Sequence, residues 1–100
     1  MNKIPRTFKM AGITFDVIIK DNVKDGSLYG CFEDVTNTIY IAKRVQLEDE
    51  WYDVPEQNMI NTFYHELFHV FHYYFNNETP EDEAQVYANF MTEFIQSKSE

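Results

Sequence analysis

The stretch between Pro55 and Pro80 contains neither glycine nor proline, and it constrains the fold more than any other part of the chain. Its apolar residues recur at the spacing of an amphipathic helix. One side of the helical wheel holds Ile60, Phe63, Leu67, Val70, Phe71 and Tyr74. Pro55 suits the first turn of a helix, and Asn76-Asn77 interrupts the apolar pattern. The sequence therefore predicts a helix over residues 55–75.

All three histidines of the chain fall on the opposite side of this predicted helix. His65 and His69 are four residues apart, which places their side chains one turn apart on a single face. Two such imidazoles can bind one zinc ion, which takes nitrogen ligands at about 2.0–2.1 Å. Glu66 follows the first histidine and can accept a proton from zinc-bound water. The run HELFH is therefore an HExxH motif, which is typical of zinc metallopeptidases.

A second helix is expected over residues 80–97. Thr79 is a suitable N-cap, Pro80 suits the first helical position, and acidic residues follow in the first turn. The helical apolar stripe consists of Ala84, Tyr87, Ala88, Met91, Phe94 and Ile95. The short loop over residues 76–79 would fold this helix back against the first one as an antiparallel hairpin.

A zinc site needs a third protein ligand besides the two histidines. Glu83, at the start of the second helix, can face the histidines across the helical hairpin. Glu81, Asp82 or another acid of residues 78–82 would replace it in a different register. His72 is the rival on the first helix, but it lies roughly 10 Å from the first histidine along the axis. An acidic residue such as Glu83 also stabilises a helix N-terminus without any metal.

The first part of the chain has the short alternating segments of a β-sheet. Strands are expected over residues 6–10, 13–19, 28–33 and 38–42, with turns at Ala11-Gly12 and Asp25-Gly26. Residues 43–54 are expected to form a charged connection, in which Trp51 anchors the chain. The sequence therefore predicts one α+β domain over residues 1–100. In it, an antiparallel or mixed sheet of three to four strands, residues 6–42, precedes two helices that carry the metal site.

The composition narrows the classes of partner. A net charge of −9 argues against nucleic acid or an anionic membrane surface, because both require a basic binding face. Cys31 is the only cysteine, so it cannot form an intramolecular disulfide, which fits a reducing compartment. The first ten residues lack the apolar run of a signal peptide. We therefore expect a cytoplasmic monomer that acts on a peptide or protein substrate.

These residues together resemble the gluzincin family of zinc metallopeptidases. The run HELFH is followed by an acidic helix start, EDEAQVYANF, and gluzincins take their third zinc ligand from a glutamate on a second helix. The layout is similar to minimal single-domain gluzincins, including phage- and prophage-borne ones loosely related to the ImmA/IrrE metallopeptidases. Tyr29-Gly30 and the segment NTIYI, residues 37–41, stand where those proteins carry Tyr-Gly and a strand. The resemblance covers most of the chain, residues 4–95.

The resemblance implies zinc bound by His65, His69 and Glu83, with Glu66 as the general base. It also implies an edge strand beside the site, onto which an extended peptide could add. Tyr87 departs from the family pattern, since gluzincins often carry an acid there that hydrogen-bonds a ligand histidine.

Two classes of function fit these observations. The first is a zinc-dependent metallopeptidase that hydrolyses peptide bonds. The second is a catalytically silent binding module, in which the zinc site or its helix serves as a scaffold for a phage or host regulatory protein. An intact Glu66 favours the enzyme, because a scaffold has no need of a base. A solvated helix face that carries two histidines needs neither metal nor partner.

Overall fold

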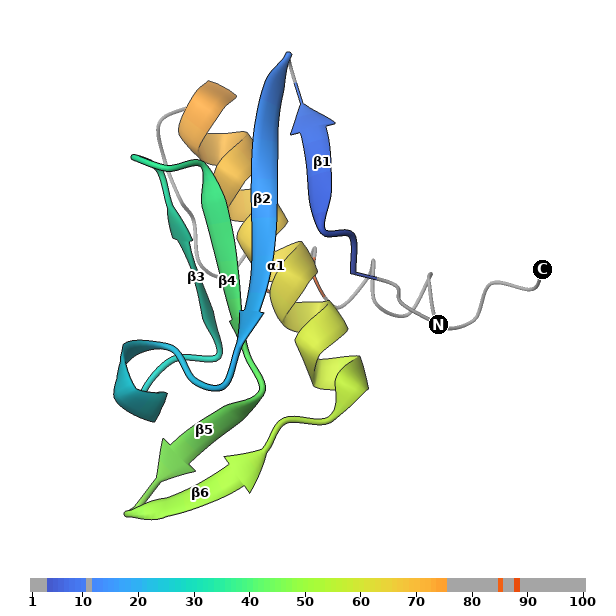
Figure 1. Cartoon of the computed structure of the whole chain (residues 1–100). Coiled ribbons are helices and arrows are strands. Elements are labelled where there is room, and N and C mark those ends of the chain that lie inside the picture. The colour runs from blue at the N-terminus through green and yellow to red at the C-terminus, as the bar shows by residue number, and fades with distance from the viewer. Residues whose placement is uncertain (1–3, 11, 76–84, 86–87, 89–100) are drawn as a thin grey trace, which may run out of the picture.

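The computed structural model describes residues 4–10, 12–75, 85 and 88. In this part of the chain, six strands precede one long helix (Figure 1). In chain order the elements are β1 (Thr7–Met10), β2 (Ile13–Lys20), the 3-10 turn η1 (Lys24–Gly26), β3 (Gly30–Glu33), β4 (Thr38–Ala42), β5 (Arg44–Leu47), β6 (Glu50–Asp53) and α1 (Glu56–Phe75). The expected strands before residue 43 and the expected first helix are confirmed, with shifts of one or two residues at four of their ten ends.

The main sheet is mixed and has four strands in the order β1-β2-β4-β3. The central pair β2 and β4 is parallel, with Val17 opposite Ile39. The outer pairs β1–β2 and β3–β4 are antiparallel. Strand β3 precedes β4 in the chain and pairs only with β4 in this sheet, so β3 lies at one edge. This confirms the expected α+β class, and of the sheets that the sequence left open it is the mixed one with four strands.

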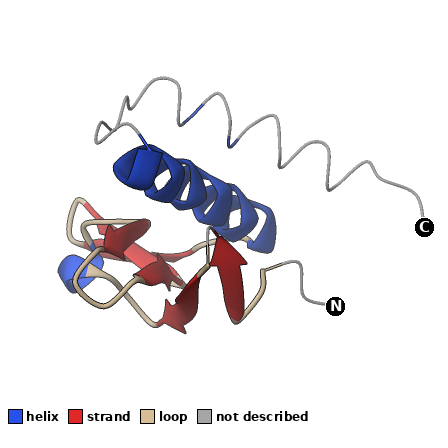
Figure 2. Ribbon diagram, turned by 90° about the horizontal axis from the view of Figure 1, so that it is seen from above, coloured by secondary structure: helices blue, strands red, loops and turns tan. Residues whose placement is uncertain are grey.

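Helix α1 covers one face of this sheet, so the domain has two layers (Figure 2). The helix begins directly after Pro55, whose carbonyl oxygen accepts hydrogen bonds from the amides of Asn58 and Met59 at 3.0 Å each. The core between the two layers is aliphatic and aromatic: Ile4, Phe15, Val17, Ile39, Ile41, Ile60, Phe63 and Val70. Each such side chain contributes about 1.5–3 kcal/mol when it leaves water.

The buried side of α1 is rotated relative to the helical-wheel prediction. Phe71 was expected on the apolar side, yet 44% of it is exposed, whereas Glu66 is only 9% exposed. The cause is β3, which approaches α1 from one side of the helix and covers that side. A helical wheel shows which residues share a side, but it does not show where a neighbouring strand will lie.

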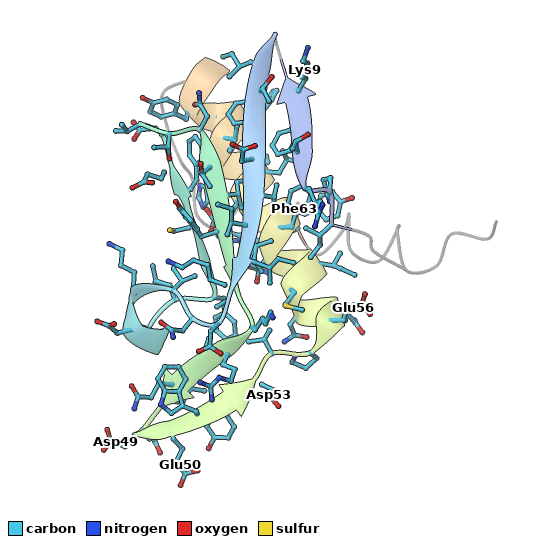
Figure 3. The ribbon with its side chains drawn as sticks, viewed as in Figure 1. Lys9, Asp49, Glu50, Asp53, Glu56 and Phe63 are labelled. Carbon is cyan, nitrogen blue, oxygen red and sulfur yellow. The ribbon has the colours of Figure 1, made fainter. Side chains whose placement is uncertain are left out.

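Strands β5 and β6 form a separate hairpin, which corrects the expectation of a charged connection over residues 43–54. Glu48 and Asp49 make its two-residue turn with φ values of 50° and 68°, as type I′ turns require. Such turns usually carry Asn-Gly or Asp-Gly, so Glu48-Asp49 is not a clear turn signal. Asp49 and Glu50 lie at the tip, away from the main sheet (Figure 3). Trp51 does anchor this segment, but against η1, where it packs on Gly26.

The predicted second helix, residues 80–97, lies almost wholly outside the described residues. Two of its residues are described: Gln85 and Ala88 are both helical, and Ala88 is completely buried. None of the described helical segments is long and apolar enough to cross a membrane.

Candidate metal centre and pocket

The helix α1 carries the whole HExxH motif without a break. His65 and His69 are both half-buried, and the Nδ1 atom of each imidazole is enclosed by protein. Their rings meet edge to face at a centroid distance of 4.8 Å and an interplanar angle of 70°. The predicted pairing of these two histidines on one helix face is therefore present.

The two Nε2 atoms converge on a single point. Nε2 of His65 and Nε2 of His69 are 3.1 Å apart. Two imidazole nitrogens on one tetrahedral zinc ion, each at about 2.05 Å, are separated by about 3.3 Å. The donor atoms thus fit a zinc ion with little adjustment. A hydrogen bond between the two imidazoles would give the same separation without metal, so the distance alone does not decide between them.

Glu66 lies on the side of α1 that faces strand β3. Gly30, the first residue of the strand, lies beside it. A Cβ atom built on Gly30 would lie 2.6 Å from Cγ2 of Thr62, 2.7 Å from the carbonyl oxygen of Tyr40 and 3.8 Å from Cγ of Glu66. Glycine is therefore the residue that lets β3 approach the helix at the level of the glutamate.

An open pocket of about 390 Å³ lies between β3 and α1. The strand contributes one wall and the helix the other. Its lining consists of Gly30, Cys31, Phe32, Asp34, Glu66, His69 and Tyr73. Glu66 and His69 therefore face a space that a ligand can enter, and they share it with an edge strand. This is what distinguishes the arrangement from two histidines on a solvated helix face.

Cys31 lines the same pocket, but its chemistry is that of an inert thiol. Burial raises the pKa of Cys31, and the negative charge of Glu66 raises it further. A nucleophilic cysteine needs the opposite shift, because the thiolate is the reactive form. The shift therefore argues against a cysteine nucleophile.

The third zinc ligand is not located among the described residues, where no group of three His, Cys, Asp or Glu side chains could hold a metal ion. Glu83, Glu81 and Asp82 all lie outside the described residues. The rival His72 is described: its ring packs on Phe68 at a centroid distance of 4.3 Å. His72 is thus part of an aromatic cluster on α1 and is absent from the pocket lining.

One contact connects the chain beyond residue 84 to the same part of α1. The side-chain amide of Gln85 donates a hydrogen bond of 3.0 Å to Oδ1 of Asn61. Asn61 lies one helical turn before His65 and on the same side of the helix. Gln85 therefore lies beside the part of α1 that carries the histidine pair.

The pocket adds residues that the sequence alone did not identify. Gly30 was noted only as part of a Tyr-Gly pair, and Phe32 and Asp34 were not singled out. They reach the site because β3 packs beside α1. This contact joins distant parts of the chain and has no local signal in the sequence. Alternation along the strand places Gly30 and Phe32 on one side, whereas Asp34 follows the end of β3 and has no such signal.

Comparisons with protein-family models, with curated proteins and with solved structures gave no match to this chain.

Proposed function

We propose that this protein is a zinc-dependent metallopeptidase. The observation that carries the proposal is the convergence of the Nε2 atoms of His65 and His69 at 3.1 Å, beside a buried Glu66 that lines an open pocket. The motif in the sequence and the separation of the two nitrogens both support zinc-dependent hydrolysis. Zinc, when bound, supplies a Lewis acid that polarises a peptide carbonyl and lowers the pKa of water.

The role of Glu66 follows from its position. Its carboxylate adjoins His69 on the pocket wall, where it can take a proton from the attacking water and return it to the leaving amine. A carboxylate that is only 9% exposed costs free energy to bury. A scaffold would be at least as stable with an apolar residue at this position, so the buried acid favours the enzyme over the silent binding module.

The edge strand β3 can hold the substrate. Within the described residues β3 pairs only with β4, so its other edge is available beside the pocket. An extended peptide that adds to this edge would gain main-chain hydrogen bonds. It would pass between β3 and α1, directly over Glu66 and His69.

Glu83 is the third ligand in this proposal. Gln85 contacts Asn61, and Glu83 is only two residues before it in the chain. This short separation along the chain supports the choice of Glu83.

The deciding experiment replaces Glu66 by glutamine. Glu66→Gln keeps the size of the side chain and removes the base, so zinc binding and the fold should persist while hydrolysis of a diverse peptide library falls about 10²–10⁴-fold. Glu56→Gln is the matched control, because it makes the same change at an exposed position on the same helix. It should leave the rate within about twofold of wild type.

Two outcomes would contradict the enzyme. One is hydrolysis by Glu66→Gln at the wild-type rate. The other is zinc-loaded wild-type protein that cleaves no library member, which would favour the scaffold for a partner protein.

A further inference from the structure

We propose that the far end of the pocket is a subsite for a basic side chain, so that the preferred substrates carry lysine or arginine near the cleaved bond. This rests on the proposed peptidase function and names its substrate class. The residues that form the subsite are Phe32, Asp34 and Tyr73, all of which line the pocket.

The alternation of β3 separates two neighbouring acids. Gly30 and Phe32 face α1, as the Gly30 contacts and the packing of Phe32 on Tyr73 show. Glu33 points to the opposite face, where its carboxylate accepts hydrogen bonds from Thr36 at 2.9 Å and Tyr40 at 3.5 Å. Asp34, which follows directly, lines the pocket instead.

Asp34 is the carboxylate available for a substrate. Its side chain is exposed, and no described residue forms an ion pair with it. The pocket lining contains two carboxylates, Asp34 and Glu66, and neither lysine nor arginine. Because Glu66 serves the reacting water in the proposed function, Asp34 is the negative charge left to select a side chain. The field of the whole chain, with its net charge of −9, has the same sign.

The aromatic residues suit the apolar part of the same ligand. The rings of Phe32 and Tyr73 meet edge to face at a centroid distance of 5.9 Å. Lysine and arginine carry an aliphatic stem that packs on apolar surface and a cationic head that aromatic faces attract. A pocket of about 390 Å³ is near the lower limit for ligand sites, so it fits one or two side chains.

The spacing along β3 predicts where the basic residue stands. Gly30 lies at the level of Glu66, and Asp34, which directly follows the end of β3, is four residues further along the chain. At about 3.3 Å per residue this is at most about 13 Å, part of which a long side chain spans. For a peptide paired with β3, the basic residue should stand two to four positions from the cleaved bond. It should lie on the same side of that bond in every substrate.

The test is cleavage of a peptide library with equal amounts of every residue at each position, aligned on the cleaved bonds by mass spectrometry. Wild type should enrich lysine and arginine about threefold to tenfold at one position. Asp34→Asn should reduce this enrichment to about one, whereas Glu33→Gln, the same loss of charge on the other face, should retain it. Cleavage without basic enrichment, or equal effects of the two variants, would overturn the subsite.

A second readout separates the subsite from the proposed enzyme. If no library member is cleaved, the peptidase function fails, and binding then decides the subsite. Zinc-loaded Glu66→Gln protein should bind hexalysine more tightly than hexaglutamine in a fluorescence anisotropy titration. In the Glu66→Gln protein, the further substitution Asp34→Asn should weaken hexalysine binding at least threefold more than the further substitution Glu33→Gln. Equal weakening would show a general attraction of cations to an acidic protein and would overturn the subsite.

Discussion

Replacing Gly30 by alanine tests the contact that places β3 beside the metal centre. The new Cβ would lie 2.6 Å from Cγ2 of Thr62 and 2.7 Å from the carbonyl oxygen of Tyr40, whereas ordinary contacts begin near 3.4 Å. Strand and helix must therefore separate by roughly 0.8 Å, or the strand must shift within the sheet. Overpacking of this kind costs about 1–3 kcal/mol, and two close contacts favour the upper half of that range. We expect Gly30→Ala to lower the free energy of unfolding by about 2–3 kcal/mol.

Thr62→Ser provides a matched rescue. Serine keeps the hydroxyl, which donates a hydrogen bond of 2.9 Å to the carbonyl oxygen of Asn58, and it removes only the methyl group that meets the new Cβ. Thr62→Ser alone should cost about 0.5–1 kcal/mol for the lost methyl. In the double variant the contact with Tyr40 persists, so about 1 kcal/mol of the damage from Gly30→Ala should be recovered.

Urea unfolding of the four proteins at one zinc concentration measures these terms, provided that the transitions are two-state with equal m-values. A Gly30→Ala variant within about 0.5 kcal/mol of wild type would refute the close approach of β3 and α1. Purely additive effects of Gly30→Ala and Thr62→Ser would show that the two side chains do not meet.

Removal of zinc should lower the melting temperature by several degrees at least, since each 1 kcal/mol shifts a domain of this size by about 4–8 °C; an unchanged melting curve after verified removal would contradict the site. Zinc content should fall in His65→Ala and His69→Ala but not in His72→Ala, whose ring packs on the helix; loss of zinc in His72→Ala alone would contradict the ligand set. The side-chain hydrogen bond from Arg44 lowers the pKa of Asp21 in the folded protein. This pair therefore stabilises the fold fully above the unfolded pKa of about 3.9, and the stabilisation is lost as the pH falls through the lower folded pKa. Asp21→Asn should therefore lower the melting temperature slightly at neutral pH and leave it unchanged near pH 2; an equal loss at both values would show that the charge is not the cause.

Local patterns in the sequence predicted the elements that local physics determines. Alternating apolar residues identified strands β1 to β4, and the segment after Pro55 identified α1 with the HExxH residues on one face. The hairpin β5–β6 was missed because its turn, Glu48-Asp49, adopts positive φ values that its residue types do not favour. Side-chain contacts support it instead: within the hairpin the guanidinium of Arg44 lies 4.9 Å from the Trp51 ring centroid, and outside it Arg44 forms an ion pair with Asp21 and Trp51 packs on Gly26.

The candidate site was predictable only in the half that α1 supplies. Spacing along one helix fixes the positions of His65, Glu66 and His69 relative to each other. The opposite wall comes from β3, more than thirty residues earlier in the chain. The position of this wall depends on Gly30 and on the rotation of α1 about its axis. Neither feature produces a periodic pattern in the local sequence. This is also why Phe71 was expected in the core and is exposed.

The position of Glu66 connects the stability of the fold to the metal. A buried carboxylate is unfavourable in a chain that already carries a net charge of −9, because desolvation and repulsion act in the same direction. A divalent cation held by His65 and His69 would offset both terms, since it places positive charge beside the glutamate on the same helix. Part of the binding free energy of zinc would then appear as folding free energy. Glu66 would then serve the proposed chemistry and, through the bound metal, the stability of the fold.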